Sequence, residues 1–199
     1  DALPNGFKKL DPEKWQRSMD LNLNAQYYMV YSFLPKLLEN EDGGNFVFVS
    51  TVAAWIGLGN TVQRHGYAAG KAGAEALTRR IGVEYAPQGI RVNVLDPGLI
   101  HTQMLRDDYG TPGTLGRDDP VWLEGRQPVD NAIPLKSIAE PWEMAGPILF
   151  LSDRGRSSYV TGAVLTADGG LTQVGAFNSE AAAISTGLKS TPSADKAEL

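Results

Sequence analysis

Two short apolar runs constrain the fold of this chain more than any other feature. The run "FVFV" at residues 46–49 shows no alternation of apolar and polar residues. A strand with one face in solvent alternates, whereas a strand covered on both faces does not. We therefore predict a strand buried on both faces, in a parallel sheet that helices cover. The run "IRVNVL" at residues 90–95 predicts a second buried strand.

One long helix is predicted over residues 12–38. Asp11 is a good N-cap, and Pro12 suits the first helical position. Pro35 is the expected place for a kink. The apolar residues of this segment recur at spacings of three and four, which predicts one apolar face: Trp15, Met19, Leu23, Tyr27, Val30, Leu34 and Leu38.

The remaining periodic segments complete an alternating order. Helices are predicted over residues 67–85 and 140–153, and a last strand is predicted within residues 162–170. The order is then helix, strand, helix, strand, helix, strand. This order is typical of an α/β fold with a parallel sheet.

Two segments lie outside this pattern. Residues 103–139 are rich in Gly, Pro and Asp and are weakly periodic, so we expect a long loop there. The loop follows the carboxyl end of a predicted strand, where open α/β sheets bind ligands. The tail beyond Gly175 has few apolar residues to bury, and we expect it to be mobile or docked on a partner.

The composition excludes several classes of function. The chain has 199 residues, enough for one domain, and no cysteine, which excludes disulfides, thiolate catalysis and cysteine-bound metal and favours a cytoplasmic protein. The net charge of −5 offers no basic field for nucleic acid or anionic lipid. No apolar run approaches the ~20 residues of a membrane span, and no signal peptide is apparent.

The predicted helix over residues 67–85 carries the clearest chemical signal. Tyr67 and Lys71 lie four residues apart, hence on one face, among residues with almost no side chain. A free tyrosine has a pKa of about 10, and a nearby cation lowers such a value by stabilising the phenolate. We therefore expect Tyr67 to serve as a general acid and base with Lys71 beside it. The surrounding alanines and glycines would let a cofactor or another helix approach closely.

Several segments in a fixed order resemble the classical branch of the short-chain dehydrogenase/reductase family. They are "DLNLNAQYY", "GGNFVFVSTVAAW", "YAAGKAGAEALTRRIGVEYAPQGIRVNVLDPGLIHTQM" and "IPLKSIAEPWEMAGPILFLSDRGRSSYVTGAVLTADGG". The resemblance implies a Rossmann-like, doubly wound parallel sheet with flanking helices. It also implies an oxidoreductase that moves a hydride between NAD or NADP and the carbon of a secondary alcohol or ketone.

The resemblance assigns roles to individual residues. Tyr67 matches the catalytic acid and base, and Lys71 matches the lysine that lowers its pKa and binds the nicotinamide ribose. Asn22 matches the asparagine that holds a water of the proton relay. For the hydroxyl that polarises the substrate oxygen, Thr51 is preferred, and Ser50 is the alternative.

The resemblance also points to the loop after the second strand. Pro97 and Gly98 match the backbone turn beneath the nicotinamide, and Ile100 and Thr102 match positions that contact its carboxamide. Three further residues are expected to have no chemical role. Asn93 is expected to be a structural asparagine of the strand, and His65 and His101 to be incidental rather than metal ligands, so that no metal site is predicted.

The Gly-rich turn that holds the pyrophosphate in this family does not occur in these 199 residues. We therefore expect the fold to be N-terminally incomplete. Residues 1–175 would form the carboxyl-side part of a single Rossmann-type dehydrogenase domain, with residues 103–139 as its substrate loop and residues 176–199 as a polar tail. Two readings remain: part of an NAD(P)-dependent alcohol dehydrogenase or carbonyl reductase, or a catalytically incompetent fragment with a structural or interaction role.

The expected partners follow from the same resemblance. They are a small-molecule alcohol or ketone and further copies of the chain in a homodimer or homotetramer, with neither nucleic acid nor a membrane. Expressed alone, the 199 residues are expected to be poorly soluble or oligomeric and to bind neither NAD(H) nor NADP(H).

Overall fold

A parallel sheet forms the centre of the molecule. The computed structural model describes residues 11–57, 65–107 and 116–174. Within them, three strands pair side by side in the order β1-β2-β3, and both pairs are parallel. The predicted parallel sheet is therefore confirmed. The strands are β1 (Gly44–Val49), β2 (Ile90–Pro97) and β3 (Val164–Ala167).

The two predicted buried strands differ in burial. Every residue of β2 is buried, as predicted, because β2 has a strand on each side. The prediction that residues 46–49 are buried on both faces is wrong for the described structure. β1 lies at an edge of the described sheet, so its residues are only half-buried and Val49 is exposed.

The predicted long helix is present, with an interruption that the sequence did not reveal. It consists of α1 (Pro12–Met19), a π-helical segment (Asp20–Asn24) and α2 (Ala25–Leu38). As predicted, Asp11 caps it, accepting hydrogen bonds from the N–H groups of Glu13 and Lys14. The irregularity lies in the π-helical segment, well before Pro35, where a kink was expected. Of the predicted apolar face, Val30 and Leu34 are buried, Met19 and Leu23 are half-buried, and the other three residues are exposed.

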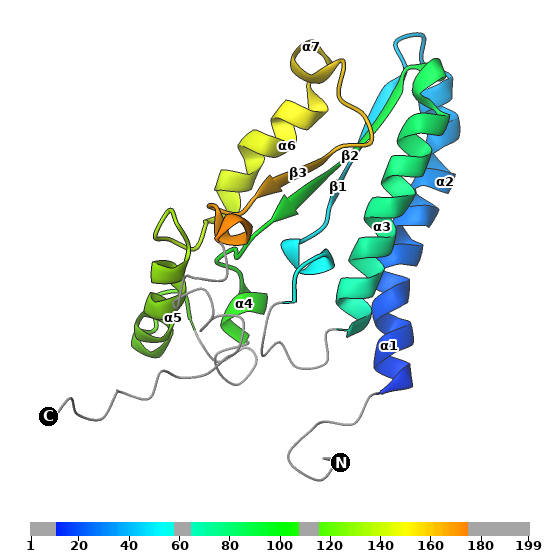
Figure 1. Cartoon of the computed structure of the whole chain (residues 1–199). Helices are drawn as coiled ribbons and strands as arrows, with labels where there is room; N and C mark the ends of the chain where they lie inside the picture. Colours follow the sequence, from blue (N-terminus) through cyan, green and yellow to red (C-terminus); the bar gives the residue numbers. More distant parts are fainter. Residues whose placement is uncertain (1–10, 58–64, 108–115, 175–199) are drawn as a thin grey trace, which may run out of the picture.

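Helices cover both faces of the sheet (Figure 1). On one face, α2 packs on β1, and α3 (His65–Glu84) packs on β2 and along α1. On the other face lies α6 (Ala145–Ser152), preceded by a 3₁₀ turn at Pro141–Met144 and followed by α7 (Arg154–Ser157). A core cluster lies between α2, α3 and the sheet and contains Val30, Leu34, Ile81, Ile90 and Val92.

The described parts of the segment over residues 103–139, namely 103–107 and 116–139, are more ordered than expected. It contains α4 (Gln103–Asp107) and α5 (Pro120–Ala132), which Figure 1 shows near the end of the sheet to which the strands point. Weak periodicity hid α5 because Pro128 lies inside it. The helix nonetheless has its own core cluster: Trp122, Val129, Ile133, Ile138 and Leu171.

Short 3₁₀ turns connect several elements, at Val52–Ala54, Ala86–Gln88 and Leu171–Gln173. The predicted tail over residues 176–199 lies outside the described residues. Among the helices of the described ranges, none is long and apolar enough to cross a bilayer.

Candidate functional site

Tyr67 and Lys71 lie on α3, near the carboxyl end of β1. The Lys71 Nζ donates a hydrogen bond of 2.7 Å to the carbonyl oxygen of Val49, the last residue of that strand. The same Nζ lies 6.0 Å from the centre of the Tyr67 ring. Both side chains are half-buried. The pair predicted from the sequence spacing therefore lies at the carboxyl ends of the strands, where open α/β folds bind ligands.

Two opposing effects act on the lysine. Burial lowers the pKa of Lys71, because a buried ammonium loses its hydration. The negative charge of Asp96 opposes this and raises the pKa. On balance, the pKa of Lys71 is below its ordinary value. The Asp96 carboxylate therefore helps to keep Lys71 protonated.

The two hydroxyl residues after β1 have different surroundings. Ser50 is 5% exposed, and its hydroxyl donates a hydrogen bond of 2.8 Å to the Glu75 carboxyl. Thr51 is half-buried, and its hydroxyl oxygen accepts a 3.3 Å hydrogen bond from the Ala53 N–H. This caps the 3₁₀ turn at Val52–Ala54, which packs against α3. The Ser50 hydroxyl thus points into the interior, whereas the Thr51 hydroxyl retains its donor for a ligand.

Asn22 lies in the π-helical segment, next to α3. Its side-chain amide donates a hydrogen bond of 2.9 Å to the Ser18 carbonyl, four residues back. Side-chain bonds of this kind compete with the helical backbone bonds. At the end of the segment, the Ala25 N–H bonds to the Asp20 carbonyl, five residues back. A Cβ on Gly70 would lie 2.9 Å from the Asn22 Cβ, so the two helices touch beside Lys71.

The turn after β2 needs glycine. A Cβ on Gly98 would lie 2.8 Å from the Cα of Asp168, so a larger residue would collide with the backbone after β3. The Gly98 N–H donates a hydrogen bond of 3.0 Å to Ala167. Pro97, the last residue of β2, is buried. The turn formed by Pro97 and Gly98 is thereby held against the end of β3.

The chain from Leu99 to Thr102 runs beside a second segment. Ile100 forms a parallel bridge with Ala139, and the His101 N–H donates a hydrogen bond of 2.8 Å to the Ala139 carbonyl. Thr102 is half-buried, and its carbonyl accepts a bond from the Arg106 N–H in α4. Ile100 and Thr102 thus lie on a backbone that is fixed on both sides.

His101 is not incidental, contrary to expectation. It is buried, and its ring Nε2 accepts a hydrogen bond of 2.8 Å from the indole N–H of Trp122 in α5. Its Nδ1 lies 3.1 Å from a Glu140 carboxyl oxygen. Since Nε2 accepts, the ring is neutral and Nδ1 carries the proton. His101 therefore anchors α5 to the loop after β2.

Two other expectations concern structural and metal-binding roles. Asn93 has the structural role expected, since its amide bonds to the Val160 carbonyl and the Ala163 N–H across the neighbouring segment. His65 is exposed at the start of α3. The described residues contain no group of His, Cys, Asp and Glu that would hold a metal ion.

Sequence reasoning missed two buried acids at this site, Glu75 and Asp96. Glu75 is 6% exposed, and Asp96 is completely buried near the end of β2. Both had a visible signal. Glu75 follows Lys71 by one helical turn on a small-residue helix, and Asp96 interrupts the apolar run of a buried strand. A charged residue in such a segment is seldom fully buried unless it is paired.

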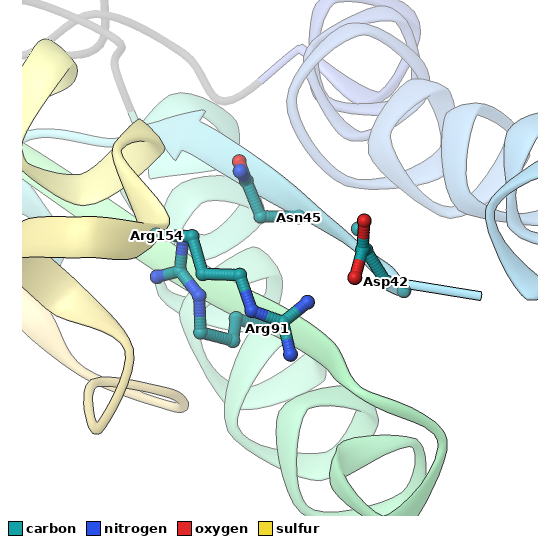
Figure 2. A pocket seen from close by; sticks show the side chains of 6 residues that line it. Asp42, Asn45, Arg91 and Arg154 are labelled. Atoms are coloured by element: carbon teal, nitrogen blue, oxygen red, sulfur yellow. The ribbon is translucent and has the colours of Figure 1, made fainter. Parts of the chain in front are cut away.

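A separate pocket lies at the opposite end of the sheet (Figure 2). It is lined by Asp42, Gly43, Gly44, Asn45, Arg91 and Arg154, near the amino ends of β1 and β2. Arg91 is buried there and hydrogen bonds to the carbonyls of Leu151 and Val160 and to the Ser157 hydroxyl. These contacts give Arg91 a structural role, distant from Tyr67 and Lys71.

Comparisons with known proteins agree with this geometry. The family model described as enoyl-(acyl carrier protein) reductase matches residues 2–172. L-rhamnose 1-dehydrogenase (NAD(P)(+)) of Azotobacter vinelandii is 34% identical over 168 residues, covering 84% of this chain and 59% of that protein. Glucose 1-dehydrogenase 2 of Bacillus subtilis is 31% identical over 172 residues, covering 86% of this chain and 59% of that protein.

Solved structures give the same result. The aldohexose dehydrogenase of Thermoplasma acidophilum, in ligand-free form, matches with a TM-score of 0.74 and 28% identity, covering 86% of this chain and 64% of that chain. This chain therefore spans less than two thirds of the length of each of these relatives. The family model covers most of the chain. The curated relatives are similar to it in sequence, and the solved structure is similar to it in fold. The chain belongs to the short-chain dehydrogenase/reductase family.

Proposed function

We propose that this chain carries the catalytic part of an NAD(P)-dependent oxidoreductase that interconverts a secondary alcohol and a ketone, or a cyclic sugar hemiacetal and its lactone. One observation carries the proposal. Tyr67 and Lys71 lie one turn apart on α3, and the Lys71 ammonium is bonded to the end of β1 directly before Ser50 and Thr51. We infer that a phenol, a cation and a hydroxyl act together at the carboxyl end of this parallel sheet.

The hydrogen-bond donors at the carboxyl ends of the strands fit the nicotinamide end of a dinucleotide. Tyr67 and Lys71 offer a hydroxyl and an ammonium for ribose hydroxyls. The chain from Pro97 to Thr102, including Gly98 and Ile100, offers a fixed backbone and the Thr102 hydroxyl for a carboxamide. We infer that these six residues hold that end of NAD or NADP. When bound, the cofactor supplies the hydride acceptor or donor.

The remaining steps belong to the chain itself. In oxidation, the Tyr67 phenolate removes the proton of the substrate hydroxyl, and in reduction the Tyr67 phenol returns it. The positive charge of Lys71 stabilises the phenolate. The Thr51 hydroxyl donates a hydrogen bond to the substrate oxygen and orients it. We propose that Asn22, which packs beside Gly70, binds the water that exchanges this proton with solvent.

A sugar hydroxyl is the substrate class that we favour. The relatives reported above are named as dehydrogenases of rhamnose, glucose and aldohexoses. At carbon 1, a cyclic sugar presents a hemiacetal hydroxyl, and removal of its proton and a hydride gives a lactone. The helices α4 and α5, within the proposed substrate loop over residues 103–139, would shape the pocket for such a ring. The alternative of a catalytically incompetent fragment is not favoured, because these relatives are dehydrogenases.

Assembly and location remain predictions. We propose a homodimer or homotetramer, because α2 exposes a group of large apolar side chains: Tyr27, Tyr28, Met29, Tyr31 and Phe33. Sedimentation that shows only a monomer at micromolar concentration would contradict this. We likewise propose that residues 1–175 are the carboxyl-side part of one dehydrogenase domain. A cytoplasmic location is a prediction from the sequence.

The test is a substrate comparison on the full-length protein. Reduction of NAD and of NADP is followed by absorbance with L-rhamnose, D-glucose and simple secondary alcohols, each at several concentrations. We expect turnover with at least one sugar and a kcat/KM at least about tenfold above that for simple alcohols. Cofactor binding without turnover on any sugar or alcohol would overturn the proposal.

A further inference from the structure

Asp96 and Glu75 form a carboxyl pair in the interior behind Lys71. Asp96 is 0% exposed, and Glu75 is 6% exposed. Asp96 comes from the end of β2, and Glu75 comes from the middle of α3, one turn after Lys71. Neither residue is needed for the proton steps proposed above. Buried acids without a metal or a strong ion pair are costly, so their presence calls for a reason.

The pair connects three segments that carry the proposed site. The indole N–H of Trp55 donates a hydrogen bond of 3.1 Å to one Asp96 oxygen, and Trp55 directly follows the turn that begins at Thr51. The Ser50 hydroxyl donates to Glu75 at 2.8 Å. The Ser50 N–H in turn bonds to the Leu95 carbonyl, next to Asp96. The end of β1, the end of β2 and α3 are thus joined through two carboxyl groups.

The surroundings assign one proton to this pair. Burial raises the pKa of Asp96 and of Glu75. The negative charge of Asp96 also raises the pKa of Glu75. The second oxygen of Asp96 is buried and has no hydrogen-bond partner among the described residues. Two neighbouring buried carboxyl groups do not both ionise readily, so the pair holds one proton, shared between the two residues.

The charge on Asp96 acts on the lysine. The other charged groups facing the pair are Lys71 and Arg79, both on α3. Arg79 lies 3.9 Å from the Glu75 carboxyl and is about half exposed, so its charge is partly screened by solvent. Lys71 is more buried, and Asp96 is the charged neighbour that raises its pKa. The lysine ammonium thus has a buried counter-charge in Asp96.

We propose that Asp96 and Glu75 act as a positioning pair, sharing one proton and one negative charge, which keeps Lys71 protonated and fixes the turn that bears Thr51. Neither residue touches substrate or cofactor in this proposal. It rests on the proposed function, since Lys71 and Thr51 are taken as members of the active site. Its consequence is that the pH range of activity depends on two residues that no ligand contacts.

The first experiment uses three variants of the full-length protein: Asp96→Asn, Glu75→Gln and Glu84→Gln. Asn retains an oxygen that accepts from Trp55, so Asp96→Asn removes the charge and keeps the hydrogen bond. Loss of this counter-charge lowers the pKa of Lys71. The ammonium of the variant therefore loses its proton at a lower pH than that of the parent. We expect the alkaline limb of the kcat profile to move down by roughly one pH unit. Glu75→Gln leaves Asp96 ionised and should move this limb less than half as far.

Glu84→Gln is the matched control. Glu84 is an exposed acid on the same helix and is paired with Arg80 at 3.4 Å. The pH profile of this variant should coincide with that of the parent. If Asp96→Asn lowers kcat at every pH without moving the alkaline limb, the pair is only structural and the proposal is overturned.

The second experiment needs no turnover. Infrared spectra of the parent at neutral pH should contain the C=O stretch of a protonated carboxylic acid. This band should be lost in Glu75→Gln and should remain in Asp96→Asn, where burial keeps Glu75 protonated. It should remain in Glu84→Gln. A band that is absent from the parent, or that survives in Glu75→Gln, overturns the proposal even if the variants are inactive. A parent that shows the band but oxidises no sugar or alcohol would overturn the proposed function and leave the shared proton established.

Discussion

The Lys71 ammonium donates a 2.7 Å hydrogen bond to the carbonyl oxygen of Val49, the last residue of β1. This bond ties α3 to the end of a strand, so the lysine cannot turn away from the sheet without leaving a carbonyl unpaired. Tyr67 is one turn earlier on the same helix, and its ring centre lies 6.0 Å from the ammonium. The position of the proposed acid and base is thus set by a contact that the lysine makes with the backbone.

Replacing Tyr67 by Phe should abolish most turnover and leave the affinity for cofactor nearly intact. Only the hydroxyl is lost, and the loss of a general acid and base typically costs about 10²–10⁴ in rate. The checks are steady-state kinetics and calorimetric titration with NAD and NADP. Tyr31→Phe is the control, because Tyr31 is exposed on α2. Turnover of Tyr67→Phe within a few-fold of the parent would remove Tyr67 from its proposed role.

Thr51→Val and Ser50→Ala should have opposite signatures. Thr51→Val removes the hydroxyl proposed to polarise the substrate and should cost mainly kcat. Ser50→Ala leaves the buried Glu75 oxygen without its 2.8 Å donor and should lower the free energy of unfolding by about 1–3 kcal/mol. Chemical denaturation and kinetics on both variants separate the two effects. A larger loss of kcat in Ser50→Ala than in Thr51→Val would transfer the polarising role to Ser50.

Gly70→Ala should disturb the contact between α3 and the π-helical segment. The added Cβ would lie 2.9 Å from the Asn22 Cβ, so one helix must shift. We expect a loss of stability of about 1–3 kcal/mol together with reduced kcat, because both Asn22 and Lys71 flank the contact. Gly146→Ala in α6 is the control, since its Cβ would meet nothing within 4 Å. That variant should be neutral or slightly more stable, because Ala favours helix over Gly. Equal stability of both variants would show that the contact is loose.

Trp122→Phe should weaken the attachment of α5 to the loop after β2. Phe retains an aromatic ring but lacks the N–H that bonds to His101 at 2.8 Å, so a buried ring nitrogen loses its donor. We expect the free energy of unfolding to fall by about 1–3 kcal/mol. If α5 shapes the substrate pocket, KM should rise more than kcat falls. Leu123→Ala, at an exposed position of the same helix, should change neither constant. An unchanged KM in Trp122→Phe would count against residues 103–139 as the substrate loop.

Asp168→Asn should lower stability at neutral pH but not in acid. Burial alone would raise the pKa of Asp168, but hydrogen bonds from Thr172 and the Gly170 N–H outweigh it, and the net pKa is below the ordinary 3.8. The carboxylate therefore contributes stability above pH 3.8, and this contribution is lost as the pH falls through the lowered pKa. Denaturation of parent and variant at neutral pH and near pH 3 should show a difference that shrinks in acid. A difference that is constant with pH would mean that ionisation of Asp168 does not stabilise the fold.

Local pattern was sufficient for the strands and for the long helices on either side of the sheet. The apolar run of residues 46–49 predicted β1, and the Val- and Ile-containing segment of residues 90–95 predicted β2. The order of segments predicted a parallel sheet, because an intervening helix leaves no short antiparallel connection. The spacing of Tyr67 and Lys71 placed them on one helical face, since this follows from the helix repeat alone. The capping of α1 by Asp11 was equally local. The helix spacing and the cap depend on neighbours within a few residues, and the parallel sheet depends on the order of the segments.

What depended on distant segments was decided only by the tertiary structure. The partial burial of β1 follows from its position at an edge of the described sheet. The interruption at Asp20–Asn24 was missed because Pro35 was the visible helix breaker, whereas the π-helical segment lies where Asn22 bonds to the Ser18 carbonyl and α3 packs alongside. The order in α5 comes from Trp122 packing and bonding to His101, 21 residues away in the chain. Glu75 and Asp96 meet for the same reason: α3 and β2 bring them together, and burial then leaves one proton shared between them.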